Sequence, residues 1–85
     1  MQSTTLSLYY YPSCPFCALV VRAIARLGID VELQNIQEDP AHLHALLEAT
    51  GRATVPCLRI DDEGASSSWM HESADIIEFL EDEAA

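Results

Sequence analysis

The sequence predicts an α/β fold in which a four-stranded mixed sheet is flanked by three helices. Short segments of alternating apolar residues are followed by segments with apolar residues at helical spacing, in the order β-α-β-α-β-β-α. Glycines stand where the first two helical segments should stop. The 85 residues are 49% hydrophobic, which is enough for one modest core and too little chain for two. We therefore expect residues 1–85 to form a single domain.

The first half of the chain predicts a β-α-β-α unit. Residues 5–11 alternate Leu and Tyr with other side chains, as strands do, and Pro12 ends that segment. A helix is expected from Pro15, which suits a first helical turn, to the stop signal at Gly28. A second strand follows at residues 31–36. Asp39 and Pro40 form a cap and first-turn pair for a second helix that runs to a glycine at position 51.

The second half predicts a hairpin and a last helix. Residues 54–60 form a strand interrupted by Pro56, residues 61–64 a turn, and residues around 67–70 a short strand. The small-residue run 65–68 is interpreted as a loop or hairpin tip. Strands joined by a helix pair in parallel through a right-handed crossover, whereas the hairpin adds an antiparallel edge. With a final helix over 72–83, helices are expected on both faces of the sheet.

The charge balance excludes one class of partner. Fourteen acidic residues face four arginines and no lysine, a formal charge of −10, whereas phosphate binding needs patches of basic residues. We interpret the charge as a soluble, self-repelling surface and expect a monomer; a salt-adapted host is an alternative cause. The N-terminus has no basic segment before an apolar one, and no long uncharged apolar run occurs. Membrane binding and secretion are therefore not expected, and the cytoplasm is the expected compartment.

Two cysteines three positions apart, Cys14 and Cys17, favour a redox couple. A thiol attacks a disulfide as the thiolate, and Cys14 lies where the start of a helix lowers a thiol pKa and where solvent has access. Cys17 lies one turn further in and can resolve a mixed disulfide. A permanent disulfide is less usual in a reducing compartment, and a zinc site usually has a second cysteine pair. The other candidate ligands are scattered: His42, His44, Cys57 and His71.

Two further residues allow more than one interpretation. A proline within an apolar strand belongs at an edge, a bulge or a special turn, and the bond before Pro56 is either trans or cis. Cys57 is interpreted as a small buried hydrophobic residue.

CPFC at 14–17, TVPCL at 54–58 and ESADIIEFL at 72–80 together resemble the glutaredoxin family of the thioredoxin-fold superfamily, over nearly all of the chain. The resemblance implies a thioredoxin-like fold and a cis Pro56 that faces the dithiol of Cys14 and Cys17. It implies a glutathione-disulfide oxidoreductase with glutathione as co-substrate, no bound cofactor or metal, and disulfide-containing or glutathionylated proteins as partners. The glutathione-binding residues that it implies are Tyr11, Phe16, Thr54, Val55, Pro56, Glu72 and Ser73.

Two departures from the glutaredoxin pattern concern glutathione. The Glu72–Ser73 pair is similar to that of the glutathione-transferase N-terminal domain, which implies that Ser73 receives the γ-glutamyl carboxylate and Glu72 the ammonium group. A plain helix cap is the alternative role for Ser73. Many glutaredoxins have basic residues where this chain has Tyr11 and Ala53, and Arg52 is one residue away from the second position.

Other functions compete with this one. A thioredoxin-like protein served by a flavoprotein reductase is one, although the usual Trp before the first cysteine and Gly-Pro between the two are absent. A glutathione-binding or iron–sulfur-carrying module without redox turnover is another, but Pro15 in the motif is typical of redox members. A complete transferase is not expected, because the large helical domain of that family is missing.

Overall fold

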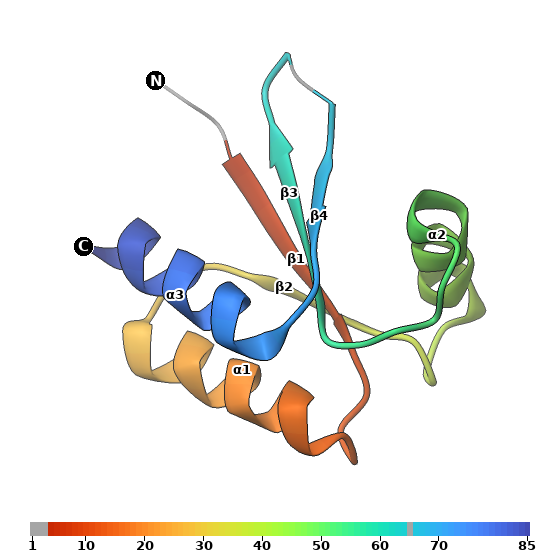
Figure 1. Cartoon of the computed structure of the whole chain (residues 1–85), viewed down its shortest axis with the longest axis horizontal. Helices are drawn as coiled ribbons and strands as arrows, with labels where there is room; N and C mark the ends of the chain where they lie inside the picture. Colours follow the sequence, from red (N-terminus) through yellow and green to blue (C-terminus); the bar gives the residue numbers. More distant parts are fainter. Residues whose placement is uncertain (1–3, 65) are drawn as a thin grey trace.

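The computed structural model describes residues 4–64 and 66–85, which fold into the predicted order of strands and helices (Figure 1). The strand order is β2-β1-β3-β4; β1 pairs in parallel with β2, and β3 is antiparallel to both β1 and β4. The predicted thioredoxin-like α/β fold with a mixed sheet is confirmed. The elements are β1 (Thr4–Tyr10), α1 (Pro15–Leu27), β2 (Glu32–Asn35), α2 (Pro40–Thr50), β3 (Cys57–Asp62), β4 (Ser68–Met70) and α3 (Ser73–Ala84).

The predicted end signals of α1 and α2 act as expected. Gly28 and Gly51 follow the two helices with φ values of 66° and 74°, a left-handed conformation that glycine adopts without steric cost. At the start of α2 the Asp39 carboxylate accepts a hydrogen bond of 2.9 Å from the Ala41 N–H. Because these ends are fixed by local chemistry, they could be predicted from the sequence.

The boundary of β3 differs from the prediction. The strand begins after Pro56, not at residue 54, because proline has no N–H to donate to a sheet ladder. It continues to Asp62, since the residues predicted to turn, Asp61 and Asp62, pair with β1. β1 and β2 are also shifted or shortened by a residue at their ends relative to residues 5–11 and 31–36. Of the predicted hairpin tip, residues 66 and 67 lie outside the strands, and Ala65 lies outside the described residues.

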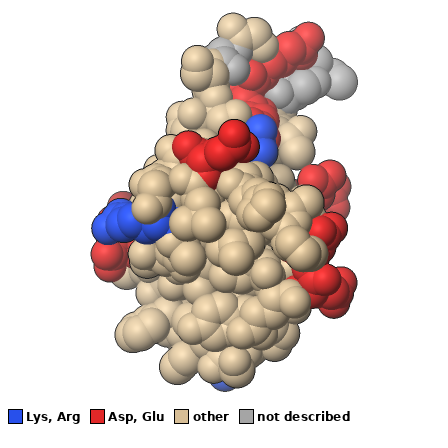
Figure 2. All heavy atoms as spheres, turned by 90° about the vertical axis from the view of Figure 1, so that its right-hand side faces the viewer, with Lys and Arg blue, Asp and Glu red and all other residues tan. Residues whose placement is uncertain are grey.

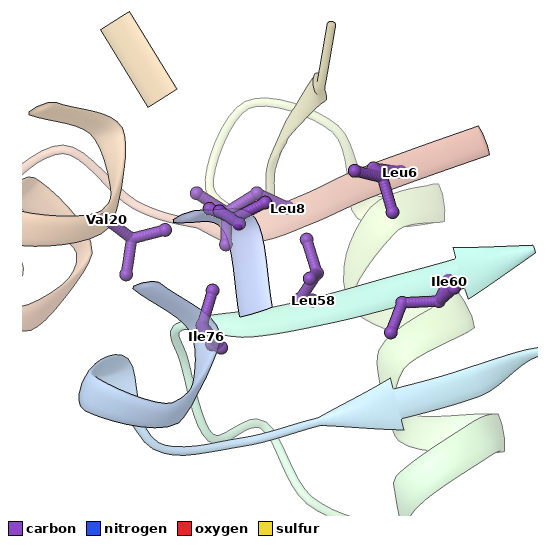
Figure 3. Close-up of a cluster of buried hydrophobic side chains, with 7 residues drawn as sticks. Leu6, Leu8, Val20, Leu58, Ile60 and Ile76 are labelled. Carbon is purple, nitrogen blue, oxygen red and sulfur yellow. The ribbon is translucent and has the colours of Figure 1, made fainter. Parts of the chain in front are cut away.

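The main core lies between one face of the sheet and the helices α1 and α3 (Figures 1 and 3). β1 and β3 alternate so that their leucines and isoleucines point to this face, and α1 and α3 contribute the opposite side. Leu19 of α1 stays 45% exposed although it is apolar. The buried residues of this core are Leu6, Leu8, Val20, Leu58, Ile60, Ile76 and Leu80.

On the other face α2 covers one end of the sheet, so helices flank both faces as predicted (Figure 1). Leu46 of α2 is fully buried against Tyr9 and Cys57, whereas Leu47 is 40% exposed. This smaller cluster contains Cys57, the first residue of β3, and so holds the end of the strand that the TVP segment directly precedes.

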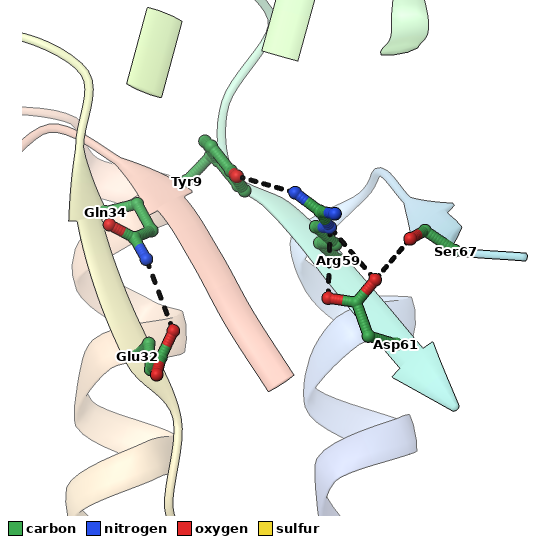
Figure 4. Close-up of polar contacts among 6 residues, drawn as sticks. All are labelled: Tyr9, Glu32, Gln34, Arg59, Asp61 and Ser67. Atoms are coloured by element: carbon green, nitrogen blue, oxygen red, sulfur yellow. Dashed lines mark hydrogen bonds and ion pairs between the residues drawn. The ribbon is translucent and has the colours of Figure 1, made fainter. Parts of the chain in front are cut away.

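A polar network lies on this face, further along the strands (Figure 4). The Arg59 guanidinium donates to Asp61 at 3.0 Å and to the Tyr9 hydroxyl at 3.4 Å, and it lies over the Trp69 ring at 5.2 Å. Hydrogen bonds from Ser67 and Arg59, and the charge of Arg59, lower the pKa of Asp61. The network therefore holds the β3–β4 hairpin through side chains as well as through its ladder.

The surface is dominated by acidic and uncharged residues. Figure 2, a view from the side on which α2 lies, shows acidic side chains in several separate groups and fewer basic ones. Among residues 4–64 and 66–85, no helix is long and apolar enough to span a bilayer.

Candidate active site

Three segments that are distant in sequence meet in a groove of about 140 Å³. They are the first turn of α1, the loop that precedes β3, and the turn between β4 and α3. Residues of the CPFC motif, the TVP segment and the Glu72–Ser73 pair thus line one groove. The groove is lined by Phe16, Thr54, Val55, Pro56, Glu72 and Ser73, all of which are among the residues that the sequence predicted for glutathione.

The TVP segment has the predicted backbone. The Val55–Pro56 peptide bond is cis, as the family resemblance implied, and Pro56 is buried. On the other side of the groove Phe16 is 60% exposed. The groove therefore has a buried proline on one wall and an exposed aromatic ring on its rim.

Cys14 occupies the N-cap position of α1, with its backbone N–H bonded to the Tyr11 carbonyl at 3.2 Å. Burial by itself would raise the pKa of the Cys14 thiol. Hydrogen bonds from the N–H groups of Cys17 and Phe16 and from the side chains of Cys17 and Tyr11 outweigh burial, so the pKa lies below its ordinary value of 9.0. The sequence predicted this lowered pKa from the helix start.

The access of Cys14 to solvent is smaller than predicted. Only 7% of the residue is exposed, and it does not line the groove itself. Phe16, two residues further, is the part of this motif that lines the groove.

Cys17 is fully buried one turn further into α1. Burial first, and then the hydrogen bond to Cys14 and the negative charge of Cys14, raise the pKa of Cys17 to about 12. Cys14, Cys17 and Cys57 are all free thiols. The site thus holds one thiol that ionises readily and one that keeps its proton.

Cys57 is the buried residue that the sequence predicted. It has no exposed surface, and burial raises its pKa to about 11 despite the charge of Arg52. Its Sγ lies 3.9 Å from Nε2 of His71, a residue that sequence analysis did not assign to the site. The register of β3 on β4 would have been the signal, because continuing it one residue beyond the pair Leu58–Met70 brings these two residues opposite each other. Arg52 does not line the groove.

The zinc alternative finds no support in geometry. Within residues 4–64 and 66–85 no group of three or more His, Cys, Asp or Glu side chains converges as metal ligands would.

Ser73 does not occupy the N-cap position of α3. The N-cap residue is Glu72, without a side-chain capping bond, and Ser73 is the first residue of the helix. Glu72 has a φ of 74°, which is costly for a residue with a side chain and is typical of constrained functional turns. Both residues therefore present polar groups to the groove at the end of a helix where unpaired N–H groups favour an anion.

Tyr11 lies elsewhere than expected. It does not line the groove; it lines another hollow with Tyr10, Pro12 and Arg22. Its side chain hydrogen-bonds to Cys14 and contributes to the lowered pKa of that thiol. The structure thus gives Tyr11 a contact with the dithiol, not with the groove.

The sheet order, the dithiol at the start of α1 and the cis-proline before β3 define a protein of the thioredoxin fold. The family model described as "Glutathione S-transferase, N-terminal domain" matches residues 8–85. The chain belongs to this family, and its glutaredoxin-like motifs and transferase-like Glu-Ser pair agree with that membership.

Two known proteins are similar to this chain over most of its length. Glutaredoxin-C4, chloroplastic, from Oryza sativa subsp. japonica is 35% identical to this chain, and the match covers 85% of this chain and 59% of that protein. A maleylacetoacetate isomerase from Anaeromyxobacter dehalogenans 2CP-1, solved with GSH in its active site, is 25% identical. It superposes with a TM-score of 0.74 over 99% of this chain and 39% of that chain. The chain therefore spans less than two thirds of the length of each of these proteins.

A glutaredoxin from Brucella melitensis shares the fold. It is 24% identical, with a TM-score of 0.56 over 93% of this chain and 79% of that chain.

We expect Cys14 to be alkylated fastest of the three thiols at neutral pH. The pKa of Cys14 is lowered, whereas those of Cys17 and Cys57 are raised to about 12 and about 11, so Cys14 has the largest thiolate fraction of the three. Its alkylation rate should rise with pH, and the midpoint of that rise should lie below 9.0. Tyr11→Phe should shift that profile to higher pH, because a hydrogen bond to the thiolate is lost. Peptide mapping after brief iodoacetamide treatment measures both, and equal rates at the three thiols would contradict the assignment.

Proposed function

We propose that the protein is a glutathione-dependent thiol–disulfide oxidoreductase of the dithiol glutaredoxin type. The observation that carries this proposal is a low-pKa Cys14 with buried Cys17 behind it, next to a groove lined by the six residues named above. The rice relative is a glutaredoxin, and the isomerase was solved with GSH in its active site. We further propose a single domain and a monomer that works in the cytoplasm, with disulfide-containing or glutathionylated proteins as substrates.

The first half-reaction is an exchange at Cys14. The Cys14 thiolate attacks the glutathione sulfur of a glutathionylated protein; a Cys14–glutathione disulfide forms, the original disulfide breaks, and the protein thiolate leaves and takes up a proton. A second glutathione thiolate then attacks the bound glutathione sulfur. Oxidised glutathione leaves, and the Cys14 thiolate returns. The low pKa of Cys14 serves both steps, since it favours the attacking thiolate and makes Cys14 a good leaving group.

Protein disulfides need the second thiol. After Cys14 attacks, Cys17 attacks the Cys14 sulfur, the reduced protein leaves with the proton that Cys17 gives up, and a Cys14–Cys17 disulfide remains. Burial is the main cause of the high Cys17 pKa, but the charge and hydrogen bond of Cys14 add to it. Both disappear once Cys14 is in a mixed disulfide, so the pKa of Cys17 falls at the step that requires its thiolate. Two glutathione molecules then restore the dithiol and leave as oxidised glutathione.

Glutathione would bind along the groove. Residues 54–56 would supply backbone groups from the loop before β3, and Phe16 an apolar surface on the rim. At the opposite end, Ser73 and the first N–H groups of α3 would take the γ-glutamyl carboxylate, and Glu72 its ammonium group.

Ser73→Ala should raise the KM for glutathione by about tenfold or more, because a hydrogen bond to a charged group contributes about 1.5–3 kcal/mol. Its melting temperature should stay near that of the wild type, since Ser73 is not the N-cap. Glu72→Gln should also raise this KM without lowering the melting temperature. Steady-state kinetics and thermal unfolding of both variants provide the measurement. A variant that melts lower, as expected for the loss of a cap of about 1 kcal/mol, with unchanged kinetics would return both residues to a structural role.

A coupled assay tests the proposed function. We expect turnover of a glutathione mixed disulfide of a small thiol in the presence of glutathione, glutathione reductase and NADPH. No turnover in this assay, together with reduction of a protein disulfide when a flavoprotein thioredoxin reductase replaces glutathione, would assign the protein to the thioredoxin type. A visible absorption band in protein purified without oxygen would instead indicate an iron–sulfur carrier.

A further inference from the structure

Two segments that line the groove, here called its two walls, lie just beyond the paired part of the β3–β4 hairpin. Residues 54–56 precede β3, and Glu72 and Ser73 follow β4 after one intervening residue. The ladder between the strands ends at the pair Leu58–Met70. The backbone hydrogen bonds of the hairpin therefore stop short of both walls and do not fix their separation.

Cys57 and His71 occupy the next position after the end of the ladder. One step beyond Leu58–Met70, the antiparallel register places Cys57 opposite His71, and the Cys57 Sγ lies 3.9 Å from His71 Nε2. Cys57 follows Pro56 directly, and His71 directly precedes Glu72. One side-chain contact thus joins the two walls of the groove.

Both partners are suited to hold a fixed geometry. Cys57 is fully buried in the cluster with Tyr9 and Leu46, so its position is set by the sheet and α2. Among the described residues Cys57 is the hydrogen-bond partner of the His71 ring, whose Nδ1 is buried without a partner. The orientation of the His71 ring therefore depends on its contact with Cys57.

The backbone next to His71 needs such support. Glu72 has a φ of 74°, a conformation that persists in a non-glycine residue only when its surroundings hold it. On its C-terminal side the Glu72 carbonyl accepts the Ile76 N–H at 3.0 Å, which ties it to α3. On its N-terminal side the ladder has already ended, and the contact of His71 with Cys57 links it to β3.

We propose that the Cys57–His71 contact is a tie that sets the spacing and backbone geometry of the groove, and that it determines glutathione affinity without touching glutathione. This inference rests on the proposed function of the groove. Cys57 and His71 are positioning residues: neither lines the groove, and neither hydrogen-bonds to Cys14. Their loss should weaken binding and leave the chemistry of the dithiol unchanged.

The test measures binding of S-methylglutathione, a thioether that cannot exchange, by titration calorimetry on the reduced protein. Cys57→Ala and His71→Phe each remove one partner, and the double variant removes both. Ile60→Val is the matched control, because it trims a buried residue of the same strand that faces the other side of the sheet. The pKa of Cys14 is measured in parallel from the pH dependence of alkylation.

We expect each single variant to bind the probe at least fivefold more weakly and the double variant no more weakly than the weaker single one, since both lose the same contact. The Cys14 pKa and the turnover at saturating glutathione should match the wild type, and Ile60→Val should bind normally. If Cys57→Ala does not fold, probe binding by His71→Phe decides, because His71 is only partly buried. Normal binding in His71→Phe, or additive losses in the double variant, would overturn the tie. A wild type that does not bind the probe would overturn the proposed function and the tie with it, whereas the first two results would leave that function intact.

Discussion

Cys14→Ser is expected to reduce thiol–disulfide exchange to the uncatalysed background with every disulfide substrate. No other group can begin the reaction: the pKa values of Cys17 and Cys57 are raised to about 12 and about 11, and both residues are fully buried. A serine hydroxyl does not ionise near neutral pH and does not replace the thiolate. The coupled assay with a glutathione mixed disulfide and with a protein disulfide measures the loss.

The folded state should survive this change. Serine is a preferred residue at the N-cap position that Cys14 occupies, so the melting temperature should be equal or slightly higher. Activity that persists in a folded Cys14→Ser variant would show that the nucleophile is another residue.

Cys17→Ser is expected to separate two activities. Turnover of small glutathione mixed disulfides should stay within about twofold of the wild type, because glutathione itself resolves the Cys14–glutathione intermediate. Reduction of protein disulfides should fall by about tenfold or more, since the internal attack on the mixed disulfide is lost. The serine hydroxyl can still donate a hydrogen bond to Cys14, so the low Cys14 pKa should change little. Loss of both activities would contradict the assignment of Cys17 as the resolving thiol alone.

Local signals were enough to predict most of the fold. The capping side chain of Asp39 and the left-handed glycines at positions 28 and 51 act within a few residues, so the sequence carries them directly. The limits of β3 depend on a distant partner, because Asp61 and Asp62 become strand residues only by pairing with β1. No periodicity within the hairpin sequence predicts that pairing.

Some features of the candidate site could likewise be predicted from local sequence signals, and others could not. The CPFC motif and its helix start predicted the lowered pKa of Cys14, since the hydrogen bonds that cause it come from the same turn and its preceding loop. The roles of Tyr11 and Ser73 were harder to predict. The side chain of Tyr11 turns to Cys14 and not to the groove, and Ser73 is displaced from the cap by the positive φ of Glu72. Both depend on backbone directions that sequence motifs do not specify.

Residues joined only by strand register were missed altogether. Cys57 was predicted as a buried residue, which is correct, but its contact with His71 follows from the register of β3 on β4. That register is set by the whole hairpin, including the network of Arg59, Asp61 and Ser67.

The central claim is that Cys14 carries glutathione during turnover, and trapping that intermediate tests it most directly. Cys17→Ser protein is treated with oxidised glutathione, quenched with acid, digested and mapped by mass spectrometry. We predict one glutathione per protein, on the peptide that contains Cys14, and none in a Cys14→Ser/Cys17→Ser control. Glutathione found on Cys57, or no glutathionylated protein under conditions that oxidise a control thiol, would contradict the claim.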